Sequence, residues 1–218
     1  MHKSLSFARS ELILGGQKSG KSRRAELLAR DWLAHAPGHK AVLIATAQAW
    51  DEEMGDRIAR HRIDRAERVP GMSTLEEPLA LAEAITRCAA PQTLVVVDCL
   101  TLWLTNLLMP AQPAKAARSE KSAKNGKELA TSTQKEASKE AAALRIRAQQ
   151  ATLLIAIQNA AGPLLLVGNE IGLGVIPMGR ETRAFVDALG RLNQDVAAVC
   201  ERVTLMAAGL PLVLKGQP

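Results

Sequence analysis

The octapeptide GGQKSGKS at residues 15–22 constrains the fold of this 218-residue chain more than any other segment. It matches the pattern G-x-x-x-x-G-K-S/T at every fixed position. The apolar run ELILGG at 11–16 leads into it, and apolar residues at helical spacing follow over 22–36. A strand, a glycine-rich loop and a helix in this order are typical of a P-loop, so we interpret the segment as a phosphate-binding loop.

The chemistry of this loop follows from its residue types. Glycines let the backbone curl so that successive N–H groups point at phosphate oxygens, and the next helix adds its positive N-terminal end. Lys21, a predicted catalytic residue, is expected to reach the β- and γ-phosphates, and the Ser22 hydroxyl is expected to bind Mg²⁺. The nucleotide-binding residues predicted in the loop are Gly15, Gly16, Gln17, Lys18, Ser19, Gly20, Lys21 and Ser22.

A P-loop enzyme also needs an acidic residue at the end of a neighbouring strand, to hold Mg²⁺ directly or through water. The run TLVVVD at 93–98 ends in Asp98, and an apolar strand has little reason to end in an unpaired charge. Glu170, which follows LLLVGN, is the competing candidate. The sequence therefore predicts a Mg²⁺-dependent nucleoside triphosphate enzyme, with Ser22 and Asp98 as metal ligands, and leaves its substrate open.

Apolar runs alternate with helical patterns along the rest of the chain. Because the runs are almost wholly apolar, we predict an α/β fold in which helices cover both faces of a mostly parallel sheet. The length and the 47% hydrophobic content favour a single domain over 1–218. The predicted strands are 11–16, 40–47, 93–100, 163–170, 202–209 and 211–215, and the predicted helices are 22–36, 51–62, 74–89, 144–161 and 182–201.

Residues 110–140 interrupt this pattern with a low-complexity basic segment. It is rich in Ala, Lys and Ser, and Leu129 is its one large apolar residue. Such a segment buries too little surface to offset its ordering entropy, so we expect a mobile surface insertion, helical in part. Its seven Lys and Arg against four Glu supply half of the net charge of +6.

The composition of the remaining chain argues against nucleic acid as a partner. Outside the insertion the chain is only mildly basic. The chain has no Tyr and two Phe, so the aromatic stacking used by single-strand-binding proteins is scarce.

Cysteine usage and hydropathy predict a cytoplasmic protein. Cys88, Cys99 and Cys200 share no C-x-x-C spacing, which favours free thiols in a reducing compartment. No apolar run approaches the ~18 residues of a membrane span, and the N-terminal residues lack the apolar core of a signal peptide.

Five sequence blocks beyond the P-loop occur in an order that carries a family resemblance. They are ATAQAWDEEMGDRIARHR at 45–62, STLEEP at 73–78, VVVDCLTLWLTNLL at 95–108, GNEIGLGVIPMGRETRAFVDALGRLNQDVA at 168–197 and GLPLVLK at 209–215. Together they resemble the bifunctional adenosylcobinamide kinase / adenosylcobinamide-phosphate guanylyltransferase family over residues 12–215, apart from the insertion.

The resemblance implies two reactions on a corrinoid precursor of adenosylcobalamin. The enzyme would phosphorylate adenosylcobinamide with ATP or GTP. It would then transfer GMP from GTP to adenosylcobinamide phosphate, giving adenosylcobinamide-GDP and pyrophosphate. A RecA-like P-loop fold and a homotrimer are also implied by the resemblance. Whether both reactions share one nucleotide site is left open.

In this family the guanylyl transfer passes through a GMP-histidine intermediate, and the histidine of the R-I-x-x-H-R/K-x-x-R block falls on His61. Arg60 and Arg62 flank His61 and disfavour a second positive charge, so they favour the neutral imidazole that can attack the α-phosphorus of GTP. The family's other nucleotide contacts carry over to Ala45, Thr46, Ala47, Arg62, Ile63, Asp64, Arg65, Glu76 and Asp98.

We also predict which face of this helix carries the chemistry. Helical spacing places residues 53, 57, 61 and 65 on one face, with Met54 and Ile58 packed behind it. The glycine-rich segment NEIGLGVIP at 169–177 is expected to line the corrinoid or nucleotide cleft.

Two departures from the family pattern keep other functions open. Ala66 stands where the family has proline, and Met72 stands where it has tryptophan. One alternative is therefore a kinase that has lost guanylyl transfer. The basic insertion, which is also not part of the family pattern, keeps open another alternative from a different class, a P-loop ATPase module that binds nucleic acid through this insertion.

Overall fold

The computed structural model describes residues 7–49, 52–109 and 132–217, which build a seven-stranded sheet in the order β3-β2-β4-β5-β1-β6-β7. All neighbouring strands run parallel except β7, which closes the edge as an antiparallel hairpin with β6. The strands are β1 (Ser10–Gly15), β2 (Lys40–Ala45), β3 (Met72–Glu76), β4 (Thr93–Asp98), β5 (Leu164–Asn169), β6 (Arg202–Ala207) and β7 (Leu210–Lys215). The helices are α1 (Lys21–His35), α2 (Glu52–Arg68), α3 (Leu81–Cys88), α4 (Leu100–Leu108), α5 (Ser132–Gln158) and α6 (Arg180–Val199).

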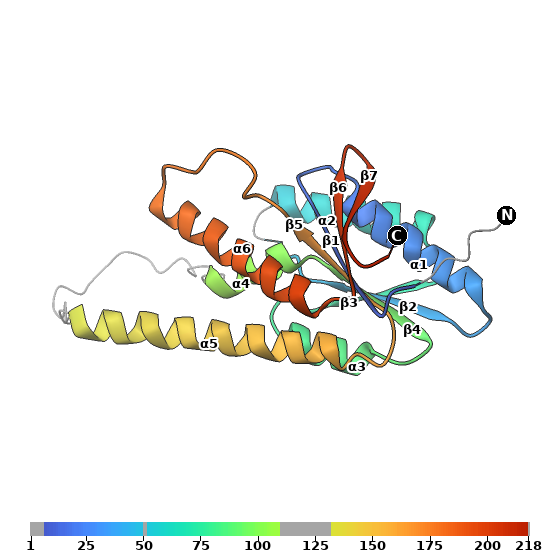
Figure 1. Cartoon of the computed structure of the whole chain (residues 1–218), viewed down its shortest axis with the longest axis horizontal. Coiled ribbons are helices and arrows are strands. Elements are labelled where there is room, and N and C mark those ends of the chain that lie inside the picture. The colour runs from blue at the N-terminus through green and yellow to red at the C-terminus, as the bar shows by residue number, and fades with distance from the viewer. Residues whose placement is uncertain (1–6, 50–51, 110–131, 218) are drawn as a thin grey trace, which may run out of the picture.

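Two hydrophobic cores form because alternate residues of each central strand face opposite sides of the sheet. In β1, Leu12 and Leu14 pack with residues of α3, α4, α5 and α6, whereas Ile13 packs with residues of α1. Figure 1 shows α5 and α6 on one side of the sheet and α1 on the other. The predicted α/β fold, with a mostly parallel sheet covered on both faces, is confirmed.

The prediction of one helix over 74–89 is wrong. Residues 72–76 form the edge strand β3 beside β2, and the helix begins only at Leu81. A short turn that contains Pro78 separates the two elements. In this turn Glu77 Oε1 accepts hydrogen bonds from the backbone N–H groups of Leu79 and Ala80. The short, half-exposed strand has too few apolar residues to stand out in the sequence, and its pairing with β2 supplies the stability that its composition lacks.

Three further boundaries differ from the prediction. The helix α4 was not predicted because its apolar residues continue those of β4, and a continuous apolar run does not show where a strand ends. The helix α2 continues to Arg68 instead of ending at 62. The helix α5 begins at Ser132 instead of 144, so residues 132–140 of the basic segment are helical, as their Ala, Glu and Lys content favours. The other residues of that segment, 110–131, lie outside the described residues.

The phosphate loop is fixed by two close backbone approaches. An ideal Cβ on Gly15 would lie 2.4 Å from Ser19 Oγ and 2.7 Å from Met206 O, so only glycine fits there. Gly20 has φ 97°, and Gly209 N, in the turn between β6 and β7, donates a 3.1 Å hydrogen bond to Ser19 O. The C-terminal hairpin therefore braces the loop.

We expect Gly15→Ala to lower the free energy of unfolding by about 1–3 kcal/mol, because the loop and β6 must move apart. For a chain of this length each kcal/mol lowers Tm by roughly 2–4 °C. Gly16→Ala is the matched control, since an ideal Cβ there meets no atom within 4 Å. Thermal unfolding of the ligand-free proteins measures both, and equal Tm values for the two variants would contradict this account of the loop.

No helix within the described residues is long and apolar enough to cross a membrane. Cys88, Cys99 and Cys200 are free thiols, as predicted.

Candidate functional site

Two adjoining cavities open beside the phosphate loop, where the carboxyl ends of the parallel strands meet. We call the first the inner cavity, and its walls come from the phosphate loop, from the ends of β2 to β5 and from one face of α2. It is lined by Gln17, Lys21, Ser22, Ala45, Ala47, Met54, Ile58, His61, Arg62, Arg65, Thr74, Glu76, Asp98, Cys99, Leu102 and Asn169.

The second, the outer cavity, lies between the phosphate loop with the first turns of α1 and the neighbouring face of α2. It is lined by Gln17, Lys18, Ser19, Gly20, Lys21, Ser22, Arg23, Glu26, Arg60, His61, Asp64 and Arg68. The two cavities share Gln17, Lys21, Ser22 and His61. His61 therefore stands where the two spaces meet, across from the lysine and the serine of the phosphate loop.

The phosphate loop has the geometry of an anion cradle. The helix α1 begins at Lys21, directly after the left-handed Gly20, so its free N–H groups and its positive end face the loop. Lys21 Nζ donates a 2.9 Å hydrogen bond to Gly16 O, which curls its side chain back over the loop. A phosphate in the cradle would meet backbone donors and an ammonium group together.

Ser22 and Asp98 lie next to each other, as a shared metal ion requires. Ser22 Oγ lies 3.4 Å from Asp98 Oδ1. Burial raises the pKa of Asp98, although the positive charge of Arg65 opposes the shift. Burial destabilises the charged form of this carboxylate, so a cation bound next to it would stabilise that form strongly.

The competing acid, Glu170, has other partners. Glu170 Oε1 accepts a 2.8 Å hydrogen bond from Gly172 N, and Oε2 lies 3.4 Å from Asn193 Nδ2. Glu170 does not line the inner cavity. Its carboxylate instead shapes the turn after β5, so the geometry favours Asp98 as the acid next to Ser22.

The face of α2 that meets the inner cavity differs from the predicted one. Met54 and Ile58 were expected behind His61, but both line the inner cavity together with His61, Arg62 and Arg65. The spacing 54, 58, 61 and 65 follows one stripe of a helix as well as 53, 57, 61 and 65 does, and only the packing of α2 against α1 and β3 decides between them. The inner cavity therefore pairs an apolar wall with a cationic one.

Ion pairs hold α2 in place on both sides of His61. Glu26 of α1, whose side chain is 6% exposed, accepts a 2.9 Å hydrogen bond from Arg68 Nη1, and its Oε1 lies 3.9 Å from Arg65 Nε. At the other edge, Arg62 pairs with Glu76 at the end of β3. The Glu26 pair raises the pKa of Arg68 through its hydrogen bond and its charge. These contacts set the distance between His61 and the phosphate loop.

Most of the predicted site residues line one of the two cavities. Within the loop Gly15 and Gly16 do not, since their role is to shape the backbone. Ile63 points to solvent, with 61% of its surface exposed. Thr46 is buried, and its hydroxyl donates to Cys99 O at 2.7 Å and accepts from Cys99 N at 2.9 Å, so it ties the end of β2 to the end of β4. The predicted residues that line a cavity are Gln17, Lys18, Ser19, Gly20, Lys21, Ser22, Ala45, Ala47, His61, Arg62, Asp64, Arg65, Glu76 and Asp98.

Sequence reasoning missed several lining residues, of which Glu26 has the clearest chemistry, whereas Asn169 was expected only as the first residue of the segment 169–177. The rule that selected Asp98, a polar residue at the end of an apolar strand, would have selected Asn169 at the end of β5 as well. Glu26 carried no comparable signal, because a glutamate in a helix is ordinarily exposed. The other missed residues are Thr74, Cys99 and Leu102 in the inner cavity and Arg23 and Arg68 in the outer one, which Arg60, predicted to act beside His61, also lines.

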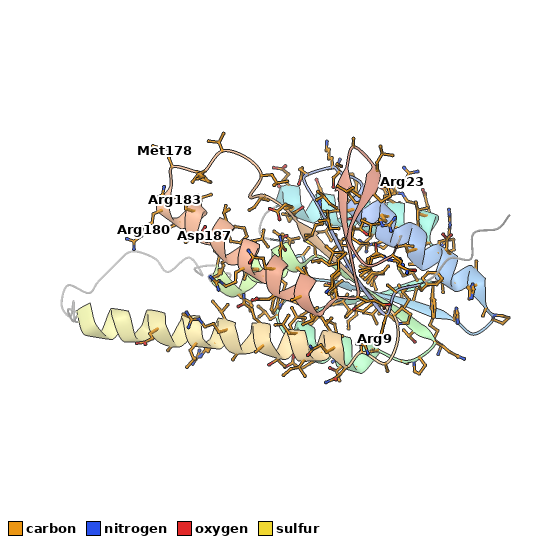
Figure 2. The ribbon with its side chains drawn as sticks, viewed as in Figure 1. Arg9, Arg23, Met178, Arg180, Arg183 and Asp187 are labelled. Atoms are coloured by element: carbon orange, nitrogen blue, oxygen red, sulfur yellow. The ribbon has the colours of Figure 1, made fainter. Side chains whose placement is uncertain are left out.

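The segment after β5 does not line the inner cavity beyond Asn169. It runs outward to the start of α6, and Figure 2 shows Met178, Arg180, Arg183 and Asp187 together at that end of the molecule. Arg183 Nη1 donates to Pro177 O at 3.0 Å and also to Met178 O, and Met178 is 94% exposed. The two departures from the family pattern, Ala66 and Met72, line neither cavity.

We expect Asp98→Asn to raise the Tm of the ligand-free protein by at least about 2 °C near neutral pH. The folded state binds the Asp98 proton more tightly than the unfolded state does, since its pKa is raised. The unfolding free energy therefore falls as pH rises from the ordinary value of about 3.9 through the raised value, and the neutral amide avoids this loss. Asp31, which pairs with Arg30 and keeps 31% of its side-chain surface exposed, provides the control Asp31→Asn, with a change of no more than about 0.5 kcal/mol. Thermal unfolding at several pH values measures the effect, and a lower Tm for Asp98→Asn would contradict it.

Comparisons with known proteins identify the family of the chain. Residues 11–214 match the model of the family described as cobinamide kinase / cobinamide phosphate guanyltransferase. The bifunctional adenosylcobalamin biosynthesis protein CobP of Pseudomonas aeruginosa is 43% identical over 208 residues, covering 95% of this chain and 98% of the relative. The bifunctional adenosylcobalamin biosynthesis proteins CobU of Escherichia coli and Salmonella typhimurium are each 33% identical, covering 94% of this chain and 98% of each relative.

Proposed function

The chain belongs to the cobinamide kinase / cobinamide phosphate guanyltransferase family, and from this premise we propose that it performs both reactions at the paired cavities beside its phosphate loop. Its place is in the biosynthesis of adenosylcobalamin, the pathway named in its relatives. The substrates are adenosylcobinamide, its phosphate, and the nucleotides ATP and GTP. The observation that carries the proposal is the position of His61, which lines both cavities together with Lys21 and Ser22.

In the kinase reaction, the hydroxyl of the aminopropanol arm of adenosylcobinamide attacks the γ-phosphorus of ATP or GTP. A bond forms between that oxygen and phosphorus, the bond to the β–γ bridging oxygen breaks, the nucleoside diphosphate leaves, and the hydroxyl proton passes to solvent. Lys21 and the loop N–H groups hold the β- and γ-phosphates, where they oppose the charge of the leaving group.

Ser22 and Asp98 are suited to hold Mg²⁺ through hydroxyl and carboxylate oxygens. The ion would neutralise charge on the phosphates. Among the described residues no three His, Cys, Asp or Glu side chains gather as a metal site, so nucleotide oxygens and water would complete the coordination.

In the guanylyl transfer, a neutral His61 nitrogen attacks the α-phosphorus of GTP. A P–N bond forms, the bond to the α–β bridging oxygen breaks, and pyrophosphate leaves. A phosphate oxygen of adenosylcobinamide phosphate then attacks the same phosphorus and displaces His61, which gives adenosylcobinamide-GDP. Arg62 and Arg65, on the same face of α2, offset the charge on the phosphoryl oxygens.

The inner cavity offers a suitable place for the nucleoside of GTP. Met54, Ile58, Ala45 and Ala47 provide an apolar wall, and the Glu76 carboxylate at the rim can accept hydrogen bonds from a base. Because Glu76 pairs with Arg62, a nucleoside bound there would also contact the helix that carries His61.

The test uses the full-length protein with Mg²⁺ and GTP labelled either at the α- or at the γ-phosphorus. We expect stable labelling from α-labelled GTP alone. The adduct should survive alkali and be lost in acid, as a phosphoramidate is, and added adenosylcobinamide phosphate should discharge it. Equal labelling of the protein by α-labelled and γ-labelled GTP would refute the histidine intermediate. The absence of labelling by either nucleotide would also refute it. A homotrimer, carried over from the family resemblance, stays a prediction.

A further inference from the structure

The outer cavity carries an excess of positive charge. Its walls contain two acids, Glu26 and Asp64, and both lie next to the same arginine. Glu26 Oε2 lies 2.9 Å from Arg68 Nη1, and Asp64 Oδ2 lies 3.2 Å from Arg68 Nη2. The cavity is therefore suited to an anionic ligand. Its other cationic side chains are those of Lys18, Lys21, Arg23 and Arg60.

Two of these side chains, Arg23 and Arg60, are not used to hold the fold together. Arg23 lies in the first turn of α1 (Figure 2), and Arg60 lies on α2 directly before His61. Both residues are exposed, and neither side chain makes a hydrogen bond or an ion pair with any other described residue. Because two helices bring these guanidinium groups to the space beside the phosphate loop, the pair is suited to bind a phosphate group.

The stereochemistry of displacement at phosphorus indicates which phosphate binds there. The entering and leaving groups lie on opposite sides of the phosphorus. When His61 attacks the α-phosphorus of GTP, pyrophosphate leaves from the side away from the imidazole, where the phosphate loop holds it. When the adduct is discharged, the attacking oxygen must displace the same imidazole nitrogen, so it arrives from the side that pyrophosphate has left.

We propose that the outer cavity binds the phosphate group of adenosylcobinamide phosphate in the place vacated by pyrophosphate, and that Arg23 and Arg60 are binding residues for both ligands. The proposal rests on the function proposed above. In the discharge, a phosphate oxygen of the corrinoid forms a bond to the α-phosphorus, and the P–N bond breaks. The electron pair of that bond returns to the ring nitrogen, and the other ring nitrogen keeps its proton, so the neutral His61 is restored.

The outer cavity also provides a route for this substrate. The nucleoside of the adduct would occupy the inner cavity, which has an apolar wall. The outer cavity is the larger of the two, with about 650 Å³ against about 240 Å³, and it also reaches His61. A phosphate on a bulky corrinoid can therefore approach the phosphorus on His61 without crossing the nucleoside.

The first test is a competition on the wild-type GMP adduct, labelled from α-labelled GTP and then freed of nucleotide. In a single turnover with Mg²⁺, adenosylcobinamide phosphate should convert the label to adenosylcobinamide-GDP, and pyrophosphate should convert it to GTP. If the two ligands share one site, the ratio of the products stays proportional to the ratio of the ligand concentrations, even when both are saturating. A product ratio that becomes constant at saturation would mean that both ligands bind at once, and it would overturn the proposal.

The second test measures how the rate of discharge depends on ligand concentration in Arg23→Gln and Arg60→Gln. We expect the half-saturating concentrations of adenosylcobinamide phosphate and of pyrophosphate to rise together, by about 5–20-fold, because a charge-assisted contact is lost at a partly exposed site. The rate at saturation should change less than about fivefold, since the imidazole and the phosphorus are untouched. Arg60→Lys keeps the charge and should recover part of the affinity.

Arg30→Gln is the matched control, because Arg30 is an exposed arginine of α1 that lines neither cavity, and it should discharge like the wild type. A rise for only one of the two ligands, or for neither, would overturn the shared site. If an arginine variant unfolds at a lowered Tm, the competition in the wild type decides. If the wild type takes no label from α-labelled GTP, the proposed function itself fails, and that failure is visible before either ligand is added.

Discussion

His61→Ala is expected to abolish the covalent GMP adduct and with it the formation of adenosylcobinamide-GDP, by at least about 10³-fold, because no other nucleophile replaces the imidazole. Phosphorylation of adenosylcobinamide should continue within about tenfold of the wild-type rate, since Lys21, Ser22 and Asp98 are untouched. The variant should then accumulate adenosylcobinamide phosphate. Chromatography of the corrinoid products, together with α-labelling of the protein, measures both effects.

His35→Ala is the control for this variant, because His35 is an exposed histidine at the end of α1 and lines neither cavity. It should label like the wild type. An α-label that persists in His61→Ala would mean that another residue forms the adduct, and the account of the inner cavity would then be wrong. A parallel loss of both reactions would mean that His61 serves the nucleotide site as a whole.

Lys21→Ala should remove both reactions together, in contrast to His61→Ala. Lys21 lines both cavities, and its ammonium group lies over the loop, where the β- and γ-phosphates of either nucleotide would bind. A charge-assisted contact of this kind, strengthened away from water, contributes about 3–4 kcal/mol to the transition state, or roughly 10²–10³-fold in rate. Steady-state phosphorylation and α-labelling, measured on one preparation, give the two losses.

The exposed Lys40, at the start of β2 and far along the sheet from the loop, provides the control Lys40→Ala, which should be active in both assays. If Lys21→Ala blocks phosphorylation but still forms the adduct at the wild-type rate, GTP must reach His61 without the phosphate loop. The enzyme would then hold two independent nucleotide sites. If both reactions fall together, one phosphate cradle serves both.

The elements that could be predicted from the sequence are those whose structure is determined by residues close to them in the chain. The loop at 15–22 and the buried strands β1, β4 and β5 were found because their glycines and apolar runs are local signals. The strand β3 was mistaken for helix because the strand that it pairs with, β2, lies more than 25 residues away in the chain, as in the pair Ala45 and Glu76. The helix α4 was missed because it follows an apolar strand without an apolar-to-polar boundary.

The candidate site likewise contains residues that local sequence patterns predicted and positions that only distant contacts determine. Lys21, Ser22, Asp98 and His61 belong to local patterns, and their residue types alone suggest phosphate, metal and nucleophile chemistry. The position of His61 across from the phosphate loop, in contrast, could not be predicted from a local pattern. It depends on Glu26 of α1 holding Arg68 and on Glu76 of β3 holding Arg62, and neither contact leaves a mark in the sequence around His61.

By itself the sequence determined the phosphate chemistry, the alternation of strands and helices and the family, because each rests on short-range residue patterns that any fold of this chain must satisfy. Only the tertiary structure decided which face of α2 meets the inner cavity, that His61 lies between two cavities, and that Asn169 lines the same cavity as Asp98. The physical reason is that strand order and helix packing bring together residues far apart in the chain. The energies that select those contacts are summed over the whole core and are not encoded at any single position.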